Sequence, residues 1–264
     1  MIALCTGIEV AYDDVGAGEP VVFLHGFPHN RTLWAPQTGA LVDRSRCIAP
    51  DLRGFGGSSV APPFSIDQYA DDVVALLDAL RIERAVVAGL SMGGYVAFAL
   101  WRRHRARVRA LILADTRPGP DSDEARQKRR ELIALARAKG SSAVAESMIP
   151  GMVGKSTREK NAGLVDAMYQ MMQNAPVDGV VGALEAMIAR PDSAPTLPTI
   201  DVPTLVVVGE EDALTPVSEA RAMHAAIPSS RLEVLAGAGH VSNFERPAAF
   251  NHVVSEFLGM LQYA

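Results

Sequence analysis

Short apolar runs, each about the length of one strand, recur along this chain and are separated by amphipathic stretches. The runs cover residues 21–24, 47–49, 85–88, 108–114, 204–208 and 232–235. Consecutive apolar residues are typical of strands buried on both faces, as in a parallel sheet. Between the runs, apolar residues recur every three or four positions over 66–80, 217–227 and 250–261, as in amphipathic helices. Ser65 and Gln68 have the spacing of a capping box, and Pro247 suits a first helical turn. This alternation predicts an α/β fold with a mostly parallel, doubly wound sheet.

Two regions depart from this alternation. The first fifteen residues alternate loosely between apolar and polar positions, and turn residues follow from Asp14 to Gly18, which predicts an antiparallel hairpin at a sheet edge. From about residue 117 to 199 no strand pattern is found, and helical patterns are split at Gly140, Pro150–Gly151, Pro176 and 191–198. We therefore expect a core formed by residues 1–116 and 200–264, with residues 117–199 inserted between two strands as an all-helical unit. Its methionines either fill a helical core or line an adaptable apolar pocket; they are Met148, Met152, Met168, Met171, Met172 and Met187.

The composition is that of a soluble globular protein. A chain of 264 residues, 48% of them apolar, suffices for one large α/β domain with an insertion. A formal net charge of −5 gives no general attraction to nucleic acid or to an anionic membrane. The basic clusters at 101–109 and 126–130 are interpreted as solvated faces, since basic residues favour helix C-termini and no nucleic-acid motif accompanies them.

Cysteine usage and the N-terminus indicate a cytoplasmic protein. Cys5 and Cys47 belong to no ligand cluster, so we expect buried free thiols in a reducing compartment. The N-terminus has neither the basic segment nor the long apolar segment of a signal peptide, and the apolar runs are far shorter than the ~20 residues of a membrane span. We expect no cofactor, no metal, and no nucleic-acid or membrane partner; a homo-oligomer stays an open alternative.

The stretch from Ala85 to Arg103 places a serine where a predicted strand turns into a predicted helix. Gly89-Leu90-Ser91-Met92-Gly93 has the form G-x-S-x-G, and in this context the motif favours a nucleophile over a glycine-rich packing turn. The helix that begins near Met92 would point its free N–H groups and positive dipole end at the serine hydroxyl. No lysine follows the motif, which excludes a phosphate-binding P-loop.

A serine nucleophile needs a general base. His240 lies in GAGHVSNFERP, just beyond a predicted strand, where a loop reaches the carboxyl edge of the sheet. His104 sits at a helix end, and His224 and His252 fall inside predicted helices, so these three are expected at the surface. We therefore predict that His240 is the base.

The base in turn needs an orienting acid. Asp212 follows a strand in LVVVGEEDALTP and gives the chain order Ser91, Asp212, His240, which is the order of the nucleophile-elbow scaffold. Asp115, at the end of LILAD, is the alternative, because an acid there can also reach the histidine. We favour Asp212.

The oxyanion that forms during acyl transfer needs hydrogen-bond donors. In VVFLHGFPHN a predicted strand runs into His25-Gly26-Phe27, so we expect the backbone N–H groups of Phe27 and Met92 to supply them. Gly26 would allow the tight turn. His25 is expected to brace this loop rather than transfer protons.

Five motifs together resemble the α/β-hydrolase family, in that family's order and approximate spacing. They are HGFP at 25–28, DLRGFGGS at 51–58, GLSMGG at 89–94, GEED at 209–212 and GHVSNFERP at 239–247. The resemblance implies the α/β-hydrolase fold, a helical cap over 117–199 and a Ser-His-Asp triad. It also implies that Asp51 and Arg53 brace a loop.

Within that family, Ser91 argues against epoxide hydrolases and haloalkane dehalogenases, whose nucleophile is a carboxylate. Carbon–carbon bond hydrolases usually carry an extra glycine-rich stretch where this chain has Pro28-His29-Asn30. Enol-lactonases have a similar cap and length, while small carboxylesterases and perhydrolases share HGxP and GxSMGG. We expect a serine hydrolase that cleaves a small carboxylic ester or lactone through an acyl-enzyme. The alternatives are a lactonase of the 3-oxoadipate enol-lactonase type, a perhydrolase or carbon–carbon hydrolase, and, from another class, a non-catalytic receptor for a small ligand.

Overall fold

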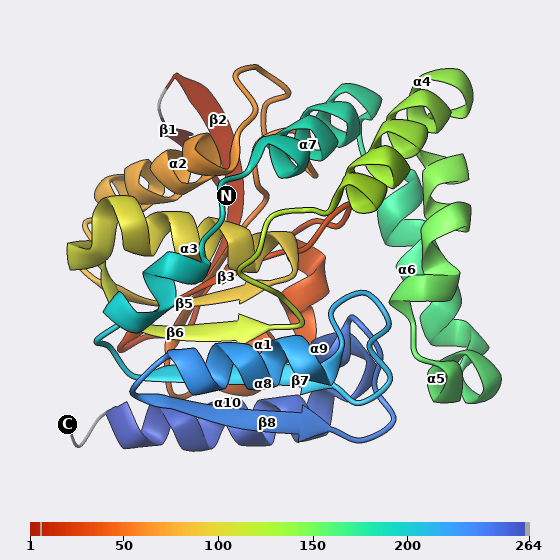
Figure 1. The fold of residues 1–264 in the computed structure, drawn as a ribbon. Coiled ribbons are helices and arrows are strands. Elements are labelled where there is room, and N and C mark those ends of the chain that lie inside the picture. The colour runs from red at the N-terminus through yellow and green to blue at the C-terminus, as the bar shows by residue number, and fades with distance from the viewer. Residues whose placement is uncertain (6, 262–264) are drawn as a thin grey trace.

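Eight strands form one sheet in the computed structural model, which describes residues 1–5 and 7–261 (Figure 1). They are β1 (Ile2–Cys5), β2 (Ile8–Val15), β3 (Pro20–Leu24), β4 (Arg46–Pro50), β5 (Ala85–Leu90), β6 (Val108–Ala114), β7 (Thr204–Gly209) and β8 (Ser230–Leu235). The sheet order is β1-β2-β4-β3-β5-β6-β7-β8, and all neighbours from β4 to β8 are parallel. Each of the six apolar runs lies in one of these strands, so the predicted mostly parallel sheet is confirmed.

The N-terminal hairpin is confirmed, but its turn was placed wrongly. β1 and β2 pair antiparallel, with Ile2 opposite Ala11, and the hairpin connection lies between β1 and β2. Asp14, expected in a turn, lies within β2 opposite Ile48 of β4. The reason is a cross-strand ion pair: the Asp14 carboxylate lies 2.6 Å from Nη2 of Arg46 on β4.

Helices cover both faces of the sheet. They are η1 (Arg31–Trp34), α1 (Ala35–Leu41), α2 (Ile66–Ala79), α3 (Met92–His104), η2 (Arg105–Arg107), α8 (Val217–Ala226), α9 (Ser242–Glu245) and α10 (Pro247–Leu261). Alternate residues of one strand enter different cores: Leu111 and Leu113 of β6 pack on the side of α2 and α3, and Ile112 packs on the side of α1 and α10. This double burial explains why the strands are apolar at consecutive positions.

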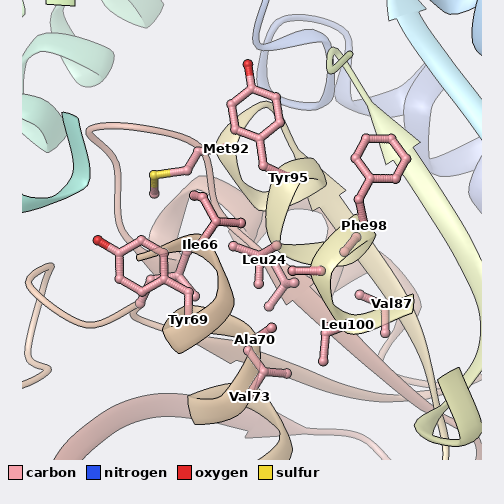
Figure 2. Close-up of a cluster of buried hydrophobic side chains, with 14 of the residues drawn as sticks. Leu24, Ile66, Tyr69, Ala70, Val73, Val87, Met92, Tyr95, Phe98 and Leu100 are labelled. Carbon is pink, nitrogen blue, oxygen red and sulfur yellow. The ribbon is translucent and has the colours of Figure 1, made fainter. Parts of the chain in front are cut away.

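The helix α2 begins where the sequence indicates. Ser65 is extended, and its side chain accepts a hydrogen bond from the N–H of Gln68 at 3.0 Å. From there, Tyr69 and Val73 reach the cluster in which α3 packs over β3 and β5 (Figure 2). This packing fixes the start of α3 next to the end of β5.

Residues 117–199 form helices between β6 and β7. They are α4 (Asp123–Met152), α5 (Lys155–Lys160), α6 (Ala162–Gln173), α7 (Val177–Ala189) and η3 (Ala194–Thr199), and α4 to α6 lie beyond the carboxyl ends of the strands (Figure 1). Gly140 interrupts α4 with a φ of +80°, as expected for a break. α4 continues past Pro150 for only two residues and ends at Met152, so the break expected at Pro150–Gly151 lies just after it, between α4 and α5.

The methionines of the insertion mostly fill its core. Met152, Met168, Met172 and Met187 are buried, and the other two pack against the same clusters. Cys5 and Cys47 are buried free thiols, and burial raises the pKa of Cys47 to about 12. None of the helices in the described residues is long and apolar enough to cross a membrane.

Helix α7 touches the core through glycines. A Cβ on Gly179 would overlap the carbonyl oxygen of Gly54, and one on Gly182 would overlap the ring of Phe64. The insertion therefore lies on the 51–58 loop with backbone in contact with backbone.

Replacing Gly179 with alanine is expected to lower the free energy of unfolding by about 1–3 kcal/mol, because α7 must move away from the core. Gly163 in α6 is the matched control, since a Cβ there meets only Asn161 Oδ1 at 3.7 Å. Denaturant unfolding of both variants measures the difference. Equal stability of the two would mean that α7 is not held in this contact.

Candidate active site

Ser91 lies between β5 and α3 in a strained turn. Its backbone has φ +53° and ψ −111°, a conformation that is rare for residues other than glycine. A Cβ on Gly89 would overlap the Gly93 carbonyl, and a Cβ on Gly93 would overlap the Leu24 carbonyl. Strand and helix thus approach as closely as the sequence motif requires. The Ser91 N–H donates to the Ala114 carbonyl at 2.9 Å, which fastens the turn to β6.

The structure brings Ser91, His240 and Asp212 together from three loops that follow β5, β8 and β7. Ser91 Oγ donates to His240 Nε2 at 2.8 Å, and His240 Nδ1–H donates to Asp212 Oδ2 at 2.9 Å. His240 and Asp212 are buried, whereas Ser91 is half-buried. This is the connectivity of a nucleophile, a general base and an orienting acid.

Asp212 is held as an anion by its surroundings. Its Oδ1 accepts hydrogen bonds from the N–H groups of Leu214 and Thr215 at 2.8 and 2.9 Å, and its Oδ2 accepts one from Thr215 Oγ1 at 2.6 Å. Burial alone would raise the pKa of Asp212, but the charge of His240 and these bonds hold it below its ordinary value. Sequence reasoning missed Thr215, although a hydroxyl residue three positions after an aspartate is a common local partner for its carboxylate.

Charges around His240 favour its protonated form. Burial alone would lower the pKa of this imidazole, but the charge and hydrogen bond of Asp212, and after them the charge of Glu245, raise it above its ordinary value. His240 can therefore hold the proton that it takes from Ser91.

Asp115, the alternative acid, is used differently. Its Oδ1 accepts from the Gly209 N–H at 2.8 Å, and its Oδ2 accepts from the N–H and the hydroxyl of Ser242 at 3.1 and 2.6 Å. Burial and the neighbouring charge of Asp212 raise its pKa to about 8. Within the described residues it makes no hydrogen bond to His240. Asp115 thus joins the loops that carry the acid and the base.

The expected oxyanion donors follow two adjacent strands. Leu24 of β3 lies opposite Gly89 of β5, so the loops that contain Phe27 and Met92 leave the same sheet edge side by side. A Cβ on Gly26 would lie 2.9 Å from the Leu90 side chain, which shows how closely these loops approach. Neither the Phe27 nor the Met92 N–H donates to an acceptor within residues 1–5 and 7–261.

His25 is fully engaged by backbone groups. Its Nδ1–H donates to the Gly26 carbonyl at 2.8 Å, and its Nε2 accepts from the Leu52 N–H at 2.9 Å. Burial lowers its pKa, so the ring is neutral. This arrangement leaves His25 no free lone pair for proton transfer.

The remaining histidines fall into two groups. His224 and His252 are exposed as expected, but His104 is half-buried and its Nε2 lies 2.7 Å from Asp71. His29 is buried beside the site, and this burial is the main cause that lowers its pKa to about 3. No sequence signal distinguished His29.

The loop after β4 is held by two acids. Asp51 accepts hydrogen bonds from the N–H groups of Arg31 and Gly57, both at 2.7 Å. Arg53 and Asp72 form a buried ion pair with two hydrogen bonds of 2.6 and 2.7 Å. Among the described side chains, no group of three or more His, Cys, Asp or Glu residues is placed to hold a metal ion.

Comparisons with known proteins agree with this fold. A family model described as the alpha/beta hydrolase fold matches residues 19–247. The chain is 32% identical to 3-oxoadipate enol-lactonase 2 of Acinetobacter baylyi over 235 residues, covering 89% of this chain and 86% of that protein. A malate-bound thermophilic esterase from Thermogutta terrifontis superposes with a TM-score of 0.95 at 41% identity, covering 99% of this chain and 98% of the esterase. The enol-lactonase from Burkholderia xenovorans LB400 gives a TM-score of 0.91 at 31% identity, covering 98% of this chain and all of that one.

Proposed function

The chain belongs to the alpha/beta hydrolase family, and we propose that it hydrolyses small carboxylic esters or lactones with Ser91 as nucleophile. The observation that carries this proposal is the continuous hydrogen-bonded path from Ser91 through His240 to Asp212. Its resemblance to an esterase and to two enol-lactonases supports ester and lactone substrates.

The proposed reaction has two halves. Ser91 Oγ attacks the acyl carbon while His240 Nε2 takes the hydroxyl proton, and the N–H groups of Phe27 and Met92 stabilise the oxyanion. The proton then passes to the leaving alkoxide, the C–O bond breaks, and an acyl-enzyme remains. Water activated by His240 attacks this ester, and Ser91 regains its proton as the acid leaves. With a lactone, the alcohol remains part of the acyl chain throughout, and the second half releases a single hydroxy acid.

We further propose that residues 117–199 act as a cap over this site, with residues 1–116 and 200–264 as the catalytic core. Helices α4 to α6 lie beyond the carboxyl ends of the strands (Figure 1), and Ser91, Asp212 and His240 lie in the loops that follow three of those ends. The carbonyl of Met152 in α4 accepts a hydrogen bond from the His240 N–H at 2.9 Å. The insertion therefore contacts the reactive residues directly.

A p-nitrophenyl ester series from acetate to octanoate, with a panel of small lactones, tests the proposed function. A fluorophosphonate probe followed by peptide mass spectrometry tests the nucleophile separately. We expect turnover and a single phosphonyl adduct on Ser91, with the preferred chain length reflecting the space under the cap. Absence of both would contradict the proposal and favour the receptor, and slow single turnover with tight product retention would do the same.

The pH dependence follows from His240, which must be neutral to accept the proton from Ser91. Because its pKa is raised above 6.5, kcat/KM is expected to fall as pH decreases through that raised value and to stay high on the alkaline side. The profile is measured with an ester that does not ionise. An enzyme that is fully active well below pH 6 would contradict the assignment of His240 as base.

A further inference from the structure

Residues 152–156, here called the docking segment, join α4 to α5 and lie against both loops that carry the acid and the base. The Met152 carbonyl accepts from the His240 N–H at 2.9 Å. The Gly154 N–H donates to Glu245 Oε2 at 3.0 Å, and the Ser156 N–H donates to Glu211 Oε2 at 2.8 Å. The insertion is thus bonded to residues beside Asp212 and beside His240.

Glu245 connects the docking segment to the histidine loop. While its Oε2 binds Gly154, its Oε1 accepts from the N–H of Gly239 at 2.9 Å. One carboxylate therefore holds the backbone of the insertion and the residue directly before His240. This bridge from Gly154 through the Glu245 carboxylate to Gly239 is here called the clamp. Because both groups that it joins are backbone N–H groups, the path of the backbone sets its geometry.

The two backbones in this clamp are in contact. A Cβ on Gly154 would lie 2.7 Å from the Gly239 nitrogen, and a Cβ on Gly239 would overlap the Gly154 nitrogen. A displacement of the docking segment must therefore also move the loop that sets the position of His240.

Glu245 is a buried carboxylate, and burying its charge costs desolvation free energy. It is only 4% exposed, and no Lys or Arg of the described chain forms an ion pair with it. Burial raises its pKa, and hydrogen bonds from Thr157, Gly154 and Gly239 oppose that rise. Two N–H donors need two acceptor oxygens, which a carboxylate supplies and a neutral amide does not, and the same carboxylate places a negative charge near His240.

The charge acts on His240. The titratable groups that face this imidazole are Asp212, Asp115, Glu245 and the neutral His29. Of the three acids, Asp212 is hydrogen-bonded to the ring and Asp115 bridges two loops, while Glu245 alone also binds the insertion.

From these contacts we infer that Glu245 is a positioning residue, which ties the docked insertion to His240 and electrostatically stabilises the imidazolium formed when Ser91 attacks. This inference rests on the proposed function and extends it. The docking segment and the loop of the general base move together, and the charge of Glu245 acts on that base. Release of the docking segment would then slow the chemical step as well as weaken substrate binding.

Three variants separate the charge from the tether. Glu245→Gln removes the charge and one acceptor, Glu245→Asp keeps the charge on a shorter arm, and Glu211→Gln weakens the neighbouring bonds to Ser156. Each is studied by NMR titration of the His240 imidazole and by kcat and KM against pH. Circular dichroism and thermal unfolding establish that each variant is folded.

We expect Glu245→Gln to lower the pKa of His240 and move the acid limb of kcat/KM to lower pH by about 0.5–1 unit. Its kcat should fall about tenfold through misplacement of the base. Glu245→Asp should keep the acid limb of the native enzyme while kcat still falls. Glu211→Gln should raise KM without moving the acid limb of the kcat/KM profile.

An unmoved His240 titration together with native kcat in folded Glu245→Gln would overturn the inference. If that variant does not fold, Gly154→Ala replaces it: undocking that leaves kcat native would also overturn it. The imidazole titration requires no turnover. A shifted titration in an enzyme whose Ser91 reacts with neither esters nor fluorophosphonate would therefore reject the proposed function while the clamp stands.

Discussion

Replacing Ser91 with alanine is expected to lower kcat by about 10⁶-fold, as removal of the nucleophile does in a Ser-His-Asp triad. Without Oγ no acyl-enzyme can form, and His240 can only activate water directly. The N–H groups of Phe27 and Met92 remain, so a residual rate of about 10³–10⁴ over water is expected. KM should change little, because the methylene and the backbone of residue 91 stay in place. Initial rates with the best p-nitrophenyl ester measure this loss.

Ser242 provides the matched control for Ser91. It is a buried serine of the same site, but its hydroxyl donates to Asp115 and not to His240. Ser242→Ala should therefore cost less than about tenfold in kcat, since it removes one hydrogen bond between loops. The fluorophosphonate adduct should form on this variant and be absent from Ser91→Ala. More than about 1% residual activity in purified Ser91→Ala would indicate that another group forms the acyl intermediate.

The fold could be read from the sequence where local chemistry decides the structure. In β6, the residues from Ala110 to Ala114 are all apolar because each face of the sheet meets helices, and α2 begins directly after Ser65 because that side chain caps it. The turn predicted at Asp14 was wrong because a residue far away in the sequence determines the structure there. Asp14 lies in a strand because Arg46, 32 positions away, neutralises it.

The site was predictable to the extent that its residues follow strand ends. Ser91 directly follows β5, and Asp212 and His240 follow within a few residues of the ends of β7 and β8; these parallel strands end at one edge of the sheet. The contacts of Glu245 with Gly154 could not be predicted in this way, because they depend on how the helical insertion folds back over that edge. A pattern within one segment carries no information about such a contact.

Replacing Asp212 with asparagine is expected to lower kcat by about 10⁴-fold. The Oδ1 atom must stay an acceptor for the N–H groups of Leu214 and Thr215, so the new amide nitrogen takes the place of Oδ2 and faces His240. There it donates to Nδ1 and forces the proton onto Nε2. The imidazole then has no lone pair for the Ser91 hydroxyl, so the loss comes from the wrong tautomer and not from unfolding.

Asp115→Asn is the matched substitution at the alternative acid, and less than about tenfold loss of kcat is expected. Because burial and Asp212 raise the pKa of Asp115 to about 8, the carboxyl is largely protonated at neutral pH, and an amide reproduces its charge. An amide oxygen can still accept from Gly209, while the amide nitrogen can donate to the Ser242 hydroxyl. Kinetics of both variants with one ester, together with proton NMR of the His240 ring, compare the two acids. If Asp115→Asn abolished activity and Asp212→Asn had little effect, the orienting acid would be Asp115, at the end of β6. Only the hydrogen-bond partner of His240 Nδ1 controls the tautomer of this imidazole.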